Sequence, residues 1–336
     1  MKLSVLLPCR NAAGTIGPCL ESLIVQNCSE YEIVAVDDGS TDGTGAALDD
    51  WARQHPRIRV VHLPPVGIVE ALNIGLSQCH GFWVARMDAD DIALPERLDA
   101  QMAWLEDHPK TQLNGCLVRH GGNSLSQGGY ARYVDWINSK IFPKDIAMSR
   151  FVESPFAHPS VVFNRRLVLD LGGYRQGEFP EDYDLVLRLL QLGTVMDKVR
   201  KTLLIWNDPP DRLSRTDSRY SISAFYRLKS QFLADWLREH NPFHPEIHVF
   251  GSSRTVRQRA SCLVERGIRV RGYFDVDPRR IGRLIHGAEV RHLRDLPAAG
   301  RMFGVSLLGK RGVREDLEIF LTARGHRVGE DYILAA

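Results

Sequence analysis

Residues 32–42 read Glu-Ile-Val-Ala-Val-Asp-Asp-Gly-Ser-Thr-Asp, and this stretch decides the fold. Its β-branched run, which ends at Val36, is typical of a buried strand, and the acidic residues and glycine after it are typical of a turn. Residues 82–91 repeat the arrangement, because an apolar run that ends at Met87 is followed by Asp-Ala-Asp-Asp. Both segments therefore place carboxylates directly after a predicted strand.

The first 110 residues alternate strand and helix patterns. Predicted strands cover residues 3–7, 32–36, 58–62 and 82–87, and predicted helices cover residues 15–25, 43–54, 68–78 and 95–106. Strict alternation predicts a parallel sheet with helices on both faces. Because ligands of such sheets bind beyond the carboxyl ends of the strands, we expect the functional residues just after Leu7, Val36 and Met87.

Beyond residue 115 the pattern changes twice. The alternation is lost over residues 115–149, where Gly121-Gly122-Asn123 and Gly128-Gly129 predict loops or a hairpin. Further helices are predicted over residues 165–171, 181–192 and 220–239, before proline-containing pairs near residue 242 predict a linker. We therefore predict an α/β protein with a large domain over residues 1–240 and a small open α/β domain over residues 247–336.

The composition is that of an ordinary globular protein. The 336 residues are 44% hydrophobic and 25% charged, which excludes a disordered or collagen-like chain. The formal net charge of +2 gives no overall field that would favour nucleic acid. From His248 onward, however, 17 basic residues face 10 acidic ones, so the small domain could meet an anionic partner.

Cysteine spacing and hydropathy predict the compartment. The six cysteines form no Cys-x-x-Cys pair and no zinc-binding spacing, which favours reduced thiols. No apolar stretch approaches the ~20 residues that span a bilayer. We therefore predict a cytoplasmic protein without a transmembrane segment, whose membrane contact, where it exists, is peripheral and at the inner face.

The acidic residues after residue 87 have the pattern of a cation site. Alternate residues of an extended segment point the same way, so Asp88 and Asp90 can converge. Converging carboxylates repel unless a cation or a proton lies between them, and Mg²⁺ or Mn²⁺ prefers oxygen ligands and completes its shell with phosphates. Helix capping and turn formation are the alternative, which we favour for Asp42.

A third acidic cluster, residues 181–184, opens a predicted helix. Acids at a helix start commonly complement the helix dipole. Asp184 lies four residues before Arg188, so these two side chains are predicted to pair on one helix face.

Several segments together carry a family resemblance. They are Leu6–Asn11, Glu32–Thr44, Ala71–Gly75, Ala85–Asp91, His158–Ser160, and Gly172–Tyr174 leading into Glu181–Leu185. In this order, across residues 2–215, the set resembles the motifs of family 2 glycosyltransferases with the GT-A nucleotide-diphospho-sugar transferase fold. The resemblance implies a hexosyltransferase-type enzyme of polysaccharide biosynthesis.

The resemblance also implies donor-binding and metal-binding residues. Pro8, Arg10 and Asn11 would line the nucleotide pocket, and Asp38 would accept a hydrogen bond from the base, usually uracil. Asn73 and Arg86 would belong to the same donor site. Asp88 and Asp90 are the D-x-D motif; Asp88 would lie near the ribose, and Asp90 would ligate the Mn²⁺ or Mg²⁺ on the diphosphate.

The remaining implied residues concern the acceptor side. Asp182 would be the general base, and Glu181 is the next candidate. His158 could face the metal or the acceptor, although a buried, hydrogen-bonded histidine is the favoured reading. Arginines at positions 212, 215 and 219 follow the core, where Arg212 and Arg215 could clamp the diphosphate or could form a solvated helix entry.

These residues predict an inverting, metal-dependent transfer of a sugar from a nucleotide-diphospho-sugar, and the resemblance implies that this donor is a UDP-sugar. The acceptor would be a hydroxyl of a glycan, a lipid-linked molecule or another compound. One alternative is a catalytically idle nucleotide-sugar binder or scaffold of a polysaccharide assembly system. Another is an NAD-binding oxidoreductase that uses the small domain.

The small domain resembles a Rossmann-like nucleotide-binding half. Val249–Arg254 lies between a predicted strand and a predicted helix, and Asp275 follows the next strand. Ser253 and Val256 replace the later glycines of the G-x-G-x-x-G fingerprint, and side chains there hinder the approach of a pyrophosphate. We therefore favour a structural role, docking to a partner, or contact between copies of the chain.

Overall fold

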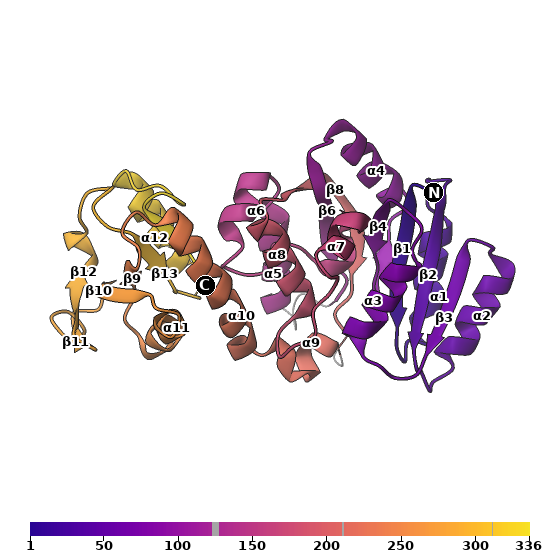
Figure 1. The fold of residues 1–336 in the computed structure, drawn as a ribbon, viewed down its shortest axis with the longest axis horizontal. Coiled ribbons are helices and arrows are strands. Elements are labelled where there is room, and N and C mark those ends of the chain that lie inside the picture. The colour runs from indigo at the N-terminus through magenta and orange to yellow at the C-terminus, as the bar shows by residue number, and fades with distance from the viewer. Residues whose placement is uncertain (123–127, 210–211, 311) are drawn as a thin grey trace. The chain divides into compact units, whose positions relative to one another are not determined.

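The computed structural model describes all residues except 123–127, 210–211 and 311. The chain divides into two compact units, which Figure 1 shows in sequence colours. The first unit comprises residues 1–146 and 155–217, and the second comprises residues 147–154 and 218–336.

The first unit is built on an eight-stranded sheet. Its spatial order is β3-β2-β1-β4-β7-β6-β8-β5. The strands are β1 (Leu3–Cys9), β2 (Tyr31–Asp38), β3 (Ile58–Leu63), β4 (Trp83–Arg86), β5 (Ile92–Ala93), β6 (Thr111–His120), β7 (Val162–Asn164) and β8 (Val195–Trp206). The strands β1 to β4 are parallel, β6 and β8 are parallel, and only β5 and β7 run against their neighbours. The predicted α/β class with a mostly parallel sheet is confirmed.

Helices flank this sheet at the predicted places, and further helices over residues 128–139, 143–149 and 213–216 were not predicted. They are α1 (Ile16–Ile24), α2 (Thr44–Gln54), α3 (Ile68–Gln78), α4 (Arg97–Asp107), α5 (Gly128–Ser139), α6 (Pro143–Ser149), α7 (Arg165–Asp170), α8 (Glu181–Gln191) and α9 (Leu213–Thr216), with a 3₁₀ turn η1 (His158–Ser160). Every residue of β1 and β2 is buried, as expected for strands covered on both faces.

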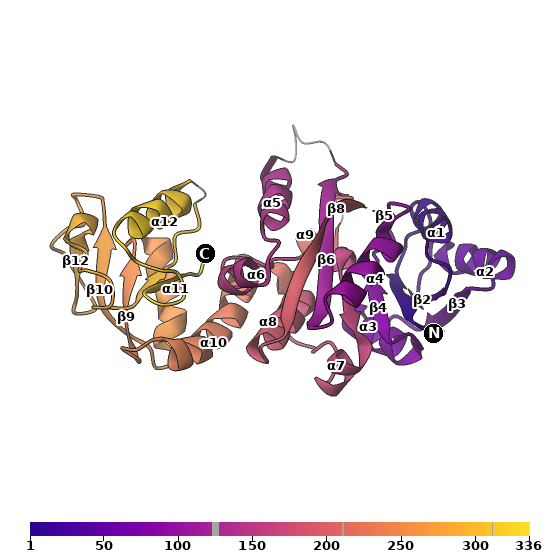
Figure 2. The ribbon, with the colours of Figure 1, turned by 90° about the horizontal axis from the view of Figure 1, so that it is seen from above.

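Strand alternation explains which helix covers which face. Val5 and Leu7 pack into one core cluster with Leu20 of α1. The intervening Leu6 faces α3, where a Cβ added at Gly75 would come within 2.4 Å of its Cδ1. Figure 2 shows α1 and α3 on either side of these strands.

The region after residue 110 differs from the prediction. Instead of loops or a hairpin, residues 111–120 form β6, which pairs in parallel with β8, and Gly128-Gly129 opens α5. Asn123 of the predicted loop lies outside the described residues. The strand β8 was not predicted, because it carries charged residues such as Asp197 and Lys198 that the fold buries.

The second unit contains the smaller sheet, in the order β11-β12-β10-β9-β13-β14. Its strands are β9 (Glu246–Phe250), β10 (Arg269–Asp275), β11 (Leu284–Ile285), β12 (Ala288–His292), β13 (Gly304–Ser306) and β14 (Tyr332–Leu334), and its helices are α10 (Ile222–His240), α11 (Arg254–Val264) and α12 (Val313–Ala323). All of the pairs are parallel except β11 with β12. Among the described residues, no helix has both the length and the apolar character needed to cross a membrane.

Candidate active site

The carboxyl ends of β1, β2 and β4 lie at one edge of the first sheet, because all three strands are parallel and in register. Asp38 ends β2, and Asp88 follows β4 after one intervening residue. The guanidinium of Arg10, just beyond β1, lies 3.1 Å from the Asp38 carboxylate. Arg10, Asp38 and Asp88 therefore all lie at this edge.

Three aspartates after β4 form a compact acidic cluster. Asp88, Asp90 and Asp91 each offer one carboxylate oxygen, and these oxygens lie within 4.8 Å of one another. Asp91 is fully buried; its Oδ1 accepts a hydrogen bond from the backbone N–H of Asn207 (2.8 Å), and its Oδ2 has no partner among the described residues. The Asn207 side chain also donates to the Asp90 carbonyl oxygen (2.6 Å).

Mutual repulsion and burial shift the pKa values in this acidic cluster. Burial and the neighbouring Asp88 raise the pKa of Asp90 to about 6, and burial, Asp88 and Asp90 raise that of Asp91. Burial would also raise the pKa of Asp88, but the charge of Arg86, whose Nη2 lies 2.6 Å from Asp88 Oδ1, helps to lower it instead. Closely spaced carboxylate oxygens, one of them buried and unpartnered, are a donor set that fits a divalent Mg²⁺ or Mn²⁺ ion.

The start of α8 supplies two further carboxylates. Glu181 and Asp182 occupy its first turn, after Pro180 at the N-cap. Asp182 accepts a hydrogen bond from the backbone N–H of Tyr183 (2.7 Å). Burial and the adjacent Glu181 raise the pKa of Asp182 to about 7. The charge of Asp88 contributes to the same rise.

Buried polar contacts fix this start of α8. Asp184 is fully buried and accepts hydrogen bonds from Arg188 Nε (2.8 Å) and Arg175 Nε (3.0 Å). Arg188 also donates to the Gly173 carbonyl oxygen (2.6 Å), which ties the helix to the glycine turn before it. The predicted Asp184–Arg188 pair is confirmed, whereas Arg175 was not predicted.

Asn73 of α3 holds the same turn from the other side. Its Nδ2 donates to the Tyr174 carbonyl oxygen (2.9 Å), and its Oδ1 accepts from the Tyr174 N–H (2.8 Å). A Cβ on Gly173 would lie 2.4 Å from Asn73 Oδ1, and its φ of +69° favours glycine. In this structure the amide predicted to bind donor therefore orients the segment that leads to α8.

Arg212 lies among aromatic side chains beside the acidic cluster. It donates to the Tyr130 hydroxyl, and its guanidinium carbon lies 4.6 Å from the Trp206 ring centroid. Despite burial, Tyr130, Asp88 and Asp91 hold the pKa of Arg212 above its ordinary value, so it is a permanent cation facing these acids.

The other predicted acceptor-side residues have protein partners. Arg215 donates to the buried Asp208. The His158 Nε2 lies 2.9 Å from the Tyr174 hydroxyl oxygen. Burial and the charge of Arg86 lower the pKa of His158 to about 3, so its ring is neutral.

On the donor side, backbone N–H groups hold the polar side chains at the ends of β1 and β2. Asp38 is 3% exposed, and its Oδ1 accepts hydrogen bonds from the N–H groups of Val66 (2.7 Å) and Gly67 (3.1 Å). Asn11 adopts a φ of +49°, and its Oδ1 accepts from the Thr41 N–H (2.9 Å). Pro8 lies within β1, in register with Val36 of β2.

In the second unit, Asp275 fastens the loops at the ends of β9 and β10. Its Oδ2 accepts from the Ser252 N–H (2.7 Å) and from Arg280 Nη1 (3.1 Å), and its Oδ1 accepts from the Val276 N–H (2.7 Å). The carboxylate at the end of the second strand of this sheet is thus already engaged by protein groups.

Solved structures with this arrangement show the fold. S. aureus TarS 1–349 in complex with UDP-GlcNAc matches with a TM-score of 0.57 and 19% identity, covering 79% of this chain and 71% of that one. The mannosyltransferase PcManGT from Pyrobaculum calidifontis, in complex with GDP-Man and Mn²⁺, matches with a TM-score of 0.51 and 21% identity over 71% and 64% of the chains. The fold is that of these glycosyltransferases.

Sequence comparisons give the family. The family model "Glycosyl transferase family 2" matches residues 4–172. The amylovoran biosynthesis glycosyltransferase AmsE of Erwinia amylovora is 36% identical over 63% of this chain and 78% of its own length. The O-antigen biosynthesis glycosyltransferase WbnJ of Escherichia coli is 26% identical over 78% and 93%. The chain belongs to glycosyltransferase family 2 and is an enzyme of that family.

Proposed function

We propose that this enzyme transfers a sugar, with inversion, from a nucleoside-diphosphate sugar to a hydroxyl of a glycan or lipid-linked acceptor. A UDP-sugar is the expected donor, and the cofactor is Mn²⁺ or Mg²⁺. The observation that carries the proposal is the acidic cluster after β4 at the carboxyl edge of the sheet, where the charge of Asp88 also helps to raise the pKa of Asp182. TarS bound to UDP-GlcNAc and PcManGT bound to GDP-Man and Mn²⁺ support it.

The donor side would be formed by two groups of residues. Asp88, Asp90 and Asp91 would hold the ion, which when bound offsets the negative charge that the leaving diphosphate gains. Residues at the ends of β1 and β2 would shape the nucleotide pocket, as would one from β4; these are Pro8, Arg10, Asn11, Asp38 and Arg86. Asn73 of α3, although expected in the same donor site, would instead hold the turn before α8. Arg212 would add a permanent positive charge next to the diphosphate, because it faces Asp88 and Asp91.

Asp182 would act as the general base. During transfer, the acceptor oxygen forms a bond to the anomeric carbon while the bond from that carbon to the diphosphate oxygen breaks, and the hydroxyl proton passes to the carboxylate. Attack from the face opposite the leaving group inverts the anomeric configuration. A pKa of about 7 suits a base near neutral pH, and a positioned base contributes about 10²–10⁴-fold to the rate. Glu181 is the second candidate for this role.

Three variants test the assignment. Asp182→Asn should reduce turnover by about 10²-fold or more and leave nucleotide affinity nearly unchanged. Asp90→Ala should weaken calorimetric binding of the nucleotide in Mn²⁺. The matched control Asp170→Asn removes an exposed carboxylate on α7 and should change neither quantity. Turnover of Asp182→Asn close to that of the parent enzyme would rule out Asp182 as the base.

A donor-hydrolysis assay with a panel of UDP- and GDP-sugars separates active transfer from an idle binding protein. Release of nucleoside diphosphate from one donor, lost in Asp182→Asn, supports an active transferase. For the second unit we propose docking to a partner or to another copy of the chain, and sedimentation of the full chain tests the latter.

A further inference from the structure

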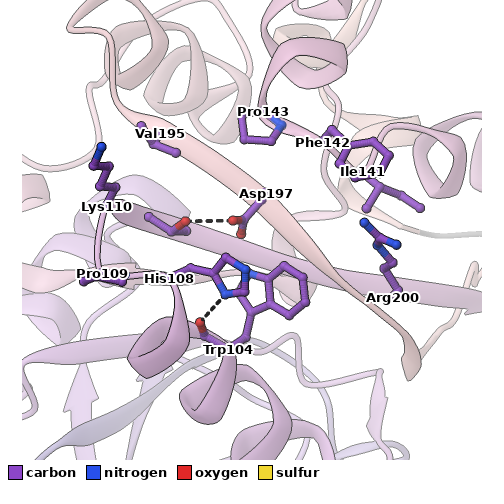
Figure 3. Close-up of a pocket in the computed structure, with 11 residues that line it drawn as sticks. Trp104, His108, Pro109, Lys110, Ile141, Phe142, Pro143, Val195, Asp197 and Arg200 are labelled. Atoms are coloured by element: carbon purple, nitrogen blue, oxygen red, sulfur yellow. Dashed lines mark hydrogen bonds between the residues drawn. The ribbon is translucent and has the colours of Figure 1, made fainter.

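A cavity of about 400 Å³ opens between α4, β6, β8 and the segment that joins α5 to α6 (Figure 3). Its volume lies within the roughly 300–1,000 Å³ usual for small-molecule sites. Trp104 and His108 form one wall, Ile141, Phe142 and Pro143 form another, and Asp197 lies between them.

The cavity is separate from the candidate active site. Asp197 lies near the start of β8, whereas Asn207, which contacts the acidic cluster, follows the end of that strand. Along the paired strand β6, Asn114 lies opposite Asp197 and His120 lies opposite Trp206, and these six residues at ~3.3 Å each place the two ends of β8 about 20 Å apart. A ligand in the cavity would therefore not touch the groups proposed for transfer.

The floor of the cavity carries an unsatisfied acceptor. Asp197 is 6% exposed, and its Oδ2 accepts a hydrogen bond from the Thr111 hydroxyl (2.7 Å). Its Oδ1 is buried without a hydrogen-bond partner in the part of the chain that the structure describes. A buried acceptor without a donor is unfavourable. Because the carboxyl torsion of aspartate is soft, a small rotation can present this oxygen to a donor in the cavity.

The walls are aromatic and the rim is cationic. The Trp104 and His108 rings stack with centroids 4.1 Å apart and planes at 9°. Phe142 is 51% exposed, and the Arg200 guanidinium carbon lies 4.6 Å from its ring centroid. Lys110 and Arg200 are both exposed at the rim.

We propose that this cavity binds one sugar residue of a glycan chain. A pyranose has an apolar C–H face that can pack on the aromatic walls. It also has hydroxyl groups that can donate hydrogen bonds to the Asp197 carboxyl. A free phosphate would face the Asp197 carboxyl, and an alkylammonium ion would face Lys110 and Arg200 at the rim. A hydroxylated ring avoids both conflicts.

Tryptophan indole N–H signals of the ¹⁵N-labelled full chain provide the test. The chain has 6 tryptophans, and Trp104→Phe identifies the signal of interest. Maltotriose and trigalacturonate serve as a neutral and an acidic probe, without donor or metal. We expect at least one of them to shift the Trp104 signal at millimolar concentration, and Asp197→Asn to weaken its binding about tenfold, as loss of a hydrogen bond to a charged group predicts.

Two further variants keep the test decisive. Phe142→Ala, which removes an exposed wall residue, should also weaken binding. The control Asp107→Asn changes an exposed carboxyl at the end of α4 that does not line the cavity, and it should leave probe binding unchanged. The proposal is overturned if neither probe shifts the signal. It is also overturned if binding survives both Asp197→Asn and Phe142→Ala but disappears in the Lys110→Gln/Arg200→Gln double variant, since that result indicates surface charge attraction alone. Because donor and metal are omitted, the outcome does not depend on the proposed chemistry at Asp182.

Discussion

Replacing Asn73 with alanine should destabilise the first unit without weakening nucleotide binding. The change removes two hydrogen bonds to the backbone of buried Tyr174, at 2.9 and 2.8 Å. Each such bond contributes about 0.5–1.5 kcal/mol net, so the expected loss is about 1–3 kcal/mol. For a unit of about 200 residues, a loss of about 2 kcal/mol lowers the Tm by roughly 4–8 °C.

Tryptophan fluorescence during thermal unfolding measures this effect, because five of the six tryptophans lie in the first unit. Calorimetric titration with UDP and Mn²⁺ gives the nucleotide affinity of the same variant. Asn27→Ala is the matched control, since Asn27 is exposed and should leave both quantities unchanged. A fall in UDP affinity at unchanged Tm would refute the reasoning and assign the Asn73 amide to the donor.

Four further outcomes are expected. The rate of sugar transfer should fall as the pH drops below about 7, because protonation of Asp182 removes the base. A rate–pH profile of the parent enzyme measures this fall. Arg188→Met should cost about 3–5 kcal/mol in chemical denaturation, because it leaves the buried carboxylate of Asp184 with only its partly exposed partner. Chelation by EDTA should lower nucleotide affinity in the parent enzyme and change it little in Asp90→Ala, as calorimetry would show. Gly75→Ala should destabilise the fold by about 1–3 kcal/mol despite its better helix propensity, because its Cβ would overlap side chains of β1 and β2; an equal or higher Tm would contradict that packing.

The sequence predicts the first half of the sheet well because the signals there are local. The strands β1 and β2 are buried on both faces, so their apolar runs are continuous, and the acidic motifs that follow them mark the carboxyl edge. The family motifs then point to Asp88, Asp90 and Asp182; the first two lie in one acidic cluster, and the role of Asp182 stays a prediction.

The strand β8 could not be predicted because its stabilising contacts are distant in sequence. Lys198 is 1% exposed, and its ammonium donates to the carbonyl oxygens of Ile137 (2.5 Å) and Pro155 (2.6 Å). A charged residue in a strand pattern normally indicates exposure, and only the tertiary structure supplies these acceptors. The aromatic surroundings of Arg212 could not be predicted for the same reason, because Tyr130 lies 82 positions away in the sequence.

Motif reasoning also finds residues without revealing how they act. Asn73 and Asp38 are both predicted to bind the donor, yet their polar atoms are engaged by backbone N–H and C=O groups. A single sequence does not distinguish a side chain that contacts a ligand from one that shapes the loop beside it.

The hydrogen bonds from Asn207 to the Asp90–Asp91 turn bear on how the chain can be shortened or varied. Asn207 lies 116 positions after Asp91, and β8 before it pairs with β5, just after the turn. A fragment that ends ahead of β8 would keep every aspartate of the D-x-D segment. It would lose the hydrogen bonds from Asn207 that hold this segment in its conformation. Insertions between these two points are therefore tolerable only where they still let β8 return to the same place beside β5.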